Sequence, residues 1–179
     1  MERTGGPIVE EVAEPAPSPV LRGTLDRIDY VDAYRAELPG SCTADIDQLV
    51  TTSFRSSPGW IGGLVKLRNR IAGPLGLKAA SGSPALGKGE HFAPGQRFGL
   101  FRVIARDEVE VVFGEDDCHL DFRLSFAKGI QADAPTTATL TVLTGVHFRR
   151  PSGRAYFGLV KPFHRRIVPS MLRATTLAL

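Results

Sequence analysis

The sequence predicts a single α+β domain in which helices cover an antiparallel sheet. Four segments between residues 98 and 148 alternate apolar and polar side chains, the pattern of strands with one buried face. Before and after these segments, apolar residues recur at helical spacing. A chain of 179 residues is long enough to bury a core without a disulfide or a structural metal.

The four predicted strands cover residues 98–104, 108–113, 118–126 and 137–148. The third is the clearest, because its apolar side chains occupy every second position and polar side chains fill the positions between them. Its apolar positions are Leu120, Phe122, Leu124 and Phe126. Short polar connections between the four segments suit hairpin turns. Together they predict a run of antiparallel strands.

Two helices are predicted ahead of these strands, after a short strand and turn at Leu25–Tyr34. Residues 45–54 have apolar side chains at helical spacing. Ser57 and Pro58 then provide a favourable N-cap and first position for a helix that extends to about Ile71.

A longer helix is predicted after the break at Pro151. The side chains of Tyr156, Phe163 and Met171 fall on one face of it. Because an interior proline costs roughly 3 kcal/mol in a straight helix, Pro162 and Pro169 predict a kinked or two-piece helix.

The charge divides the chain into three regions. Residues 1–22 are acidic and rich in proline, which predicts a disordered tail ahead of one domain at 23–179. The formal net charge is +3, yet residues 149–179 hold seven basic side chains and no acidic one. This basic segment is either the solvated face of the last helix or a surface for an anionic partner. A membrane surface or a nucleic acid is therefore an alternative partner.

Several classes of function lack support in the sequence. The two cysteines and four histidines show no metal-ligand spacing, so no metal site is expected. There is no phosphate-binding loop, dinucleotide fingerprint or nucleophile elbow, so no cofactor is expected. The chain shows neither a secretory signal nor an apolar run of spanning length, which predicts a cytoplasmic protein.

Four segments carry a resemblance to a known family: LDRIDYVDAY, SPGWIGGLVKLRNRI, HLDFRLSF and GRAYFGLVKPFHRRIVPSML. The chain resembles an uncharacterised bacterial family, domain of unknown function 2867. More broadly, it is similar to the START-like lipid carriers and polyketide cyclases of the helix-grip superfamily. The resemblance implies a curved antiparallel sheet wrapped around the C-terminal helix. It also implies a cavity for a hydrophobic small molecule between the two, but it names no reaction.

Two polar residues interrupt apolar helix faces and are the candidates for chemistry. Arg68 lies in projection between Ile61 and Leu64, and His164 lies between Phe157 and Met171. A charge at a core-facing position needs a partner. The partner is either a ligand or another side chain of the protein, and the sequence leaves both readings open.

The leading hypothesis is a carrier or sensor with an apolar cavity and a few polar groups. Its expected ligand-binding residues are Trp60, Arg68, Phe122, Tyr156, Phe163 and His164. The first alternative is a cyclase-like or hydratase-like enzyme in the same cavity, with His164 as the acid or base and Arg68 stabilising an enolate. The second alternative is an interaction surface on the basic C-terminal helix.

Overall fold

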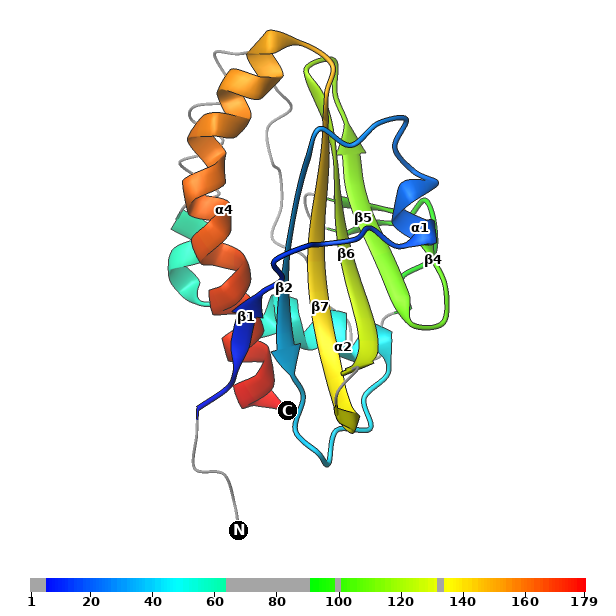
Figure 1. Cartoon of the computed structure of the whole chain (residues 1–179), viewed down its shortest axis with the longest axis vertical. Coiled ribbons are helices and arrows are strands. Elements are labelled where there is room, and N and C mark those ends of the chain that lie inside the picture. Colours follow the sequence, from blue (N-terminus) through cyan, green and yellow to red (C-terminus); the bar gives the residue numbers. More distant parts are fainter. Residues whose placement is uncertain (1–5, 64–90, 99–100, 132–133) are drawn as a thin grey trace.

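The described part of the chain forms one open antiparallel sheet with a long helix along one face (Figure 1). The computed structural model describes residues 6–63, 91–98, 101–131 and 134–179. Across the sheet, the seven strands are β1 (Val9–Glu11), β2 (Tyr30–Glu37), β7 (Ala134–Phe148), β6 (Leu120–Gln131), β5 (Glu110–Asp116), β4 (Phe101–Arg106) and β3 (Arg97–Phe98). The predicted α+β class with an antiparallel sheet is confirmed.

The four predicted strands correspond to β4, β5, β6 and β7, and the last two are longer than the alternating pattern indicates. The strand predicted at Leu25–Tyr34 is displaced, because β2 begins only at Tyr30 and continues to Glu37. Just before β2, the Asp29 carboxylate accepts the Phe148 backbone N–H at 2.8 Å. This contact fixes the start of β2 against the end of β7.

The first of the two predicted helices is confirmed as α2 (Ile46–Arg55). Its first turn is closed by a capping box, in which the Asp45 carboxylate accepts from the Gln48 N–H and the Gln48 side chain bonds back to the Asp45 N–H. Of the second predicted helix, residues 59–63 are helical. The remainder lies outside the described residues.

The C-terminal helix α4 (Pro151–Ala178) is continuous and contains both interior prolines. Of the two predicted forms, kinked or two-piece, the two-piece helix is therefore wrong. The carbonyls left without helical partners by Pro162 and Pro169 belong to Gly158 and Arg165, which are both exposed. Water can satisfy these carbonyls, so the prolines do not divide the helix. No helix in the described ranges is long and apolar enough to span a bilayer.

The sheet face beneath α2 and α4 holds two apolar clusters. The larger one includes Val50 of α2, Phe126 of β6 and Leu172 of α4, all with no exposed surface. The smaller one is built on Leu120, Val146 and Tyr156 near the start of α4. We call this face the inner face.

The segment expected to be a disordered tail contributes to the fold from residue 6 onward. Val9–Glu11 pairs with β2, and α1 (Pro19–Arg22) lies on the opposite, outer face of the sheet (Figure 1). Leu21 of α1 is fully buried against Gly145, and Ser18 Oγ donates to the buried Glu110 carboxylate at 2.8 Å. Backbone pairing and one well-placed leucine therefore order a segment whose composition is polar.

Candidate functional site

A band of polar side chains crosses the inner face between the two apolar clusters. Asp32 of β2 and Thr144 of β7 are directly opposite each other in the sheet, and both are about 5% exposed. His164 of α4 reaches them from above, with Nε2 at 2.9 Å from Thr144 Oγ1 and 3.2 Å from Asp32 Oδ1. We call Asp32, Thr144 and His164 the polar band.

The band occupies the same level on all three elements. On each element, the next inward-facing residue on one side of the band belongs to the smaller cluster. The next inward-facing residue on the other side of the band belongs to the larger cluster. These neighbours are Tyr30 and Tyr34 on β2, Val146 and Val142 on β7, and Val160 and Val168 on α4. The polar band therefore stands where apolar side chains would continue the core.

Hydrogen bonds keep the Asp32 carboxyl group charged. Burial raises the pKa of Asp32, but bonds from His164, Tyr30 and Thr144 outweigh this effect, and the net result is a pKa below its ordinary value. The Tyr30 hydroxyl donates to Asp32 Oδ2 at 2.7 Å. Burial and this bond to Asp32 raise the pKa of Tyr30, so its hydroxyl stays protonated.

The charged Asp32 favours one tautomer of His164. A carboxylate only accepts hydrogen bonds, so in the neutral imidazole the N–H is at Nε2 and the lone pair is on Nδ1. Within the described residues, Nδ1 has no hydrogen-bond partner. The His164 side chain is 16% exposed. Such a nitrogen can accept a hydrogen bond from a ligand or take a proton from it.

The structure brings together three of the six expected ligand-binding residues. Tyr156 and Phe122 belong to the smaller apolar cluster beside the polar band, and His164 lies in the band. Trp60 and Phe163 are 46% and 38% exposed. Arg68 lies outside the described residues.

The placement of Phe163 follows from the orientation of α4. The buried positions of this helix include Tyr156, Val168 and Leu172, so His164 is near the centre of the packed face. The apolar stripe in the sequence instead placed Phe163 on the same buried face as Tyr156 and Met171. The apolar stripe is broader than the buried face of the helix, because it includes Leu159 and Phe163, which are exposed.

Asp32, Thr144 and Tyr30 are site residues that sequence reasoning missed. The clearer signal came from Asp32, which interrupts the inward-facing alternation of tyrosines in β2. Thr144 gave a weaker signal, because it interrupts the alternation of Val142 and Val146 in β7, but threonine is common in strands. Only the register between β2 and β7 shows that Thr144 is opposite Asp32.

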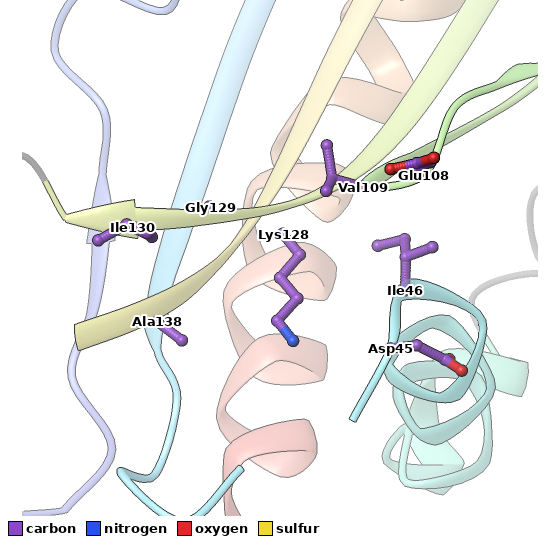
Figure 2. Close-up of a pocket in the computed structure, with 8 residues that line it drawn as sticks. All are labelled: Asp45, Ile46, Glu108, Val109, Lys128, Gly129, Ile130 and Ala138. Carbon is purple, nitrogen blue, oxygen red and sulfur yellow. The ribbon is translucent and has the colours of Figure 1, made fainter. Parts of the chain in front are cut away.

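A groove of about 500 Å³ lies on the inner face at the far end of the sheet, where β6 and β7 pass the start of α2 (Figure 2). Ile46, Val109, Ile130 and Ala138 give it apolar walls. Lys128 extends between the sheet and α2, where its ammonium group donates to the Ala44 carbonyl at 2.7 Å. The fully buried Phe126 and Val142 pack beyond Lys128 in the larger apolar cluster, so this groove is a place distinct from the polar band.

Comparison with protein families gives one match over most of the chain. The model of a family described as protein of unknown function (DUF2867) matches residues 24–171. This range contains the whole polar band. The comparisons with curated proteins and with solved structures found no match.

Proposed function

The chain belongs to the DUF2867 family of proteins of unknown function, and from the geometry of its inner face we propose that it binds a hydrophobic small molecule. The ligand has an apolar or aromatic body and a polar group that donates a hydrogen bond to His164 Nδ1. It lies between the sheet and α4, in a helix-grip arrangement of the START-like kind. The protein acts as a carrier or sensor of this ligand.

The observation that carries the proposal is the polar band itself. Burying polar groups in an apolar core costs free energy unless each group is paired. Asp32 is satisfied by three donors, but one nitrogen of His164 is left available. Ligand sites commonly combine apolar walls with a few polar groups of this kind.

Apolar side chains of the sheet supply a wall for the body of the ligand, from Leu124, which is opposite Thr144, outward to β4. Phe101 of β4, Phe122 of β6 and Leu124 of β6 are only partly buried, although the core residues around them are fully buried. The rings of Phe101 and Phe122 are in contact, with their centroids 5.7 Å apart. A flat aromatic ligand can stack against such a pair.

Competition binding tests the role of His164. The fluorescent fatty acid cis-parinaric acid reports occupancy, and 2-naphthol and its methyl ether compete for the site. The two competitors share one aromatic body, but only the naphthol can donate a hydrogen bond. We expect wild type to bind the naphthol about five- to tenfold more tightly than the ether, as one hydrogen bond provides.

The variant His164→Gln provides the comparison. Glutamine can still donate to Asp32 through its amide NH₂, but its carbonyl oxygen does not take the position of the ring nitrogen Nδ1. We therefore expect the preference for the naphthol to weaken or disappear. His119→Gln changes a histidine that is bonded to Ser152, and this control should keep the preference. If cis-parinaric acid does not bind, or if His164→Gln retains the full preference of wild type, the proposal is wrong.

The contact between Asp32 and His164 also favours a second function, an enzyme with His164 as general base. A carboxylate that fixes the tautomer of a histidine is a common arrangement for proton abstraction. In a cyclase-like or hydratase-like reaction, Nδ1 would remove a proton from the carbon next to a carbonyl group.

Exchange of hydrogen for deuterium distinguishes the enzyme from the carrier. Benzoylacetone, an enolisable diketone, is dissolved in D₂O with the protein, and NMR follows the loss of its methylene signal. An enzyme accelerates this loss in wild type but not in His164→Gln. Equal exchange rates with wild type and His164→Gln would exclude a catalytic role of His164 and leave its role in binding.

A further inference from the structure

The turn between β5 and β6 brings three metal-binding side chains together. A carboxylate oxygen of Asp117, the sulfur of Cys118 and a ring nitrogen of His119 all lie within 4.8 Å of one another. We propose that these three residues bind a divalent transition-metal ion such as Zn²⁺. The sequence predicts no metal site, because ligands at three consecutive positions match none of the usual spacings.

The backbone holds this turn in place. The His119 carbonyl accepts from the N–H groups of Arg149 and Arg150 at 3.0 and 3.1 Å, and the Asp117 N–H donates to the Leu120 carbonyl at 3.1 Å. In addition, the first turn of α4 packs closely on His119 through Gly153. The backbone that carries the three donors is therefore positioned before any ion binds, which lowers the cost of ordering the site.

A hydroxyl group from α4 orients the imidazole of His119. Ser152 Oγ lies 2.7 Å from His119 Nδ1. When the hydroxyl accepts from an Nδ1–H group, Nε2 keeps the lone pair that a cation needs. Metal-binding histidines typically have such a partner on the second ring nitrogen. Ser152 is thus an observation independent of the three ligands.

Cysteine binds a metal ion as the thiolate. Binding at Cys118 would therefore displace the thiol hydrogen and release it to solvent as a proton.

The donor types indicate the class of metal. One sulfur, one nitrogen and one oxygen, with water as a fourth ligand, suit Zn²⁺ and Co²⁺ in tetrahedral geometry. Ca²⁺ and Mg²⁺ prefer sites made of oxygen only.

Titration of the untagged full-length protein with Co²⁺ tests the proposal. We expect a thiolate-to-cobalt charge-transfer band, the visible absorption of tetrahedral Co²⁺, and displacement of Co²⁺ by Zn²⁺. Cys118→Ser should remove the charge-transfer band, and His119→Gln should weaken binding. Cys42→Ser and His91→Gln are matched controls, and both should bind like wild type.

Two further variants examine the surroundings of the ion. Ser152→Ala should weaken Co²⁺ binding about tenfold, as the loss of a partner of a metal-bound histidine does. Arg150→Gln removes a nearby positive charge and should tighten binding. Absence of saturable binding, a spectrum without the thiolate band, or a band that persists in Cys118→Ser would show an adventitious ion only and overturn the proposal.

Discussion

Gly153 is the residue at which the start of α4 meets the sheet. A Cβ at this position would overlap the His119 carbonyl, which belongs to the backbone and cannot rotate away. Gly158 lies in the same helix, and a Cβ there would meet nothing within 4 Å. The two glycines therefore have different roles: Gly153 permits close packing, and Gly158 fills an exposed helical position.

Alanine substitutions at the two glycines should have opposite effects. Gly153→Ala forces α4 away from His119 and should lower the free energy of unfolding by about 1–3 kcal/mol, the range for overpacking. Gly158→Ala should raise it by about 0.5–1 kcal/mol, because alanine favours a helix. Urea unfolding measures both changes, and equal effects of the two substitutions would contradict the close packing at Gly153.

Asp32 couples the stability of the protein to pH. Because its pKa in the folded protein is below the ordinary value of 3.8, the charged form is stabilised by folding. This contribution is fully present above the unfolded pKa and is lost as the pH falls through the folded pKa.

The variant Asp32→Asn should reduce this dependence on pH. Urea unfolding between pH 6 and pH 3 gives the free energy of unfolding of each protein. We expect the stability advantage of wild type over Asp32→Asn to shrink as the pH falls below about 4. The exposed Asp26 provides the control Asp26→Asn, which should follow wild type at every pH. An advantage that stays constant down to pH 3 would show that Asp32 does not titrate as the structure implies.

Among the elements, the N-terminal segment differs most from its expected role. Glutamates and prolines dominate its composition, yet α1 covers the outer face of the sheet. Leu21 and the partly buried Val20 and Leu25 pack there against the buried Val112 and Leu143. The segment also buries Glu110, whose carboxylate accepts from Ser18 and Ser125. The outer face is thus a second, smaller core.

Truncation of Leu21 tests whether α1 stabilises the sheet. Leu21→Ala should cost about 2–5 kcal/mol, the range for a fully buried leucine. Ile8 precedes β1 and is 50% exposed, so Ile8→Ala should cost less than about 0.5 kcal/mol. Thermal or urea unfolding gives both values. A small effect of Leu21→Ala would show that the segment only rests on the sheet.

At the scale of the whole molecule, the sequence predicted local patterns well and long-range pairings poorly. Alternating side chains predicted β6, and the interrupted apolar stripe of α4 directed attention to His164. Asp32 and Thr144 are 112 residues apart in the sequence, and no local pattern relates them. Their contact depends on how β2 pairs with β7, a register that one sequence does not specify.

Long-range contacts also determine which charged side chains pair with each other. Two of the basic side chains after residue 148 pair with acidic side chains from distant elements: Arg149 with Asp121 at 2.6 Å and Arg165 with Glu11 at 2.6 Å. The Arg165–Glu11 pair is exposed on both sides and contributes little to stability. The Asp121 carboxylate is buried, so its pairing with Arg149 offsets a cost of burying the charge. The Arg149–Asp121 pair connects the segment just before α4 to β6, and the Arg165–Glu11 pair connects α4 to β1.

NMR of the histidine ring nitrogens is the most direct test of the central claim, that His164 presents Nδ1 to a ligand. Long-range ¹H–¹⁵N spectra of the free protein should show His164 with its hydrogen on Nε2. Saturation with 2-naphthol should shift the Nδ1 resonance of His164 and leave those of His91, His119 and His147 in place. A hydrogen on Nδ1 in the free protein, or a ligand that binds without moving the His164 signal, would contradict the account.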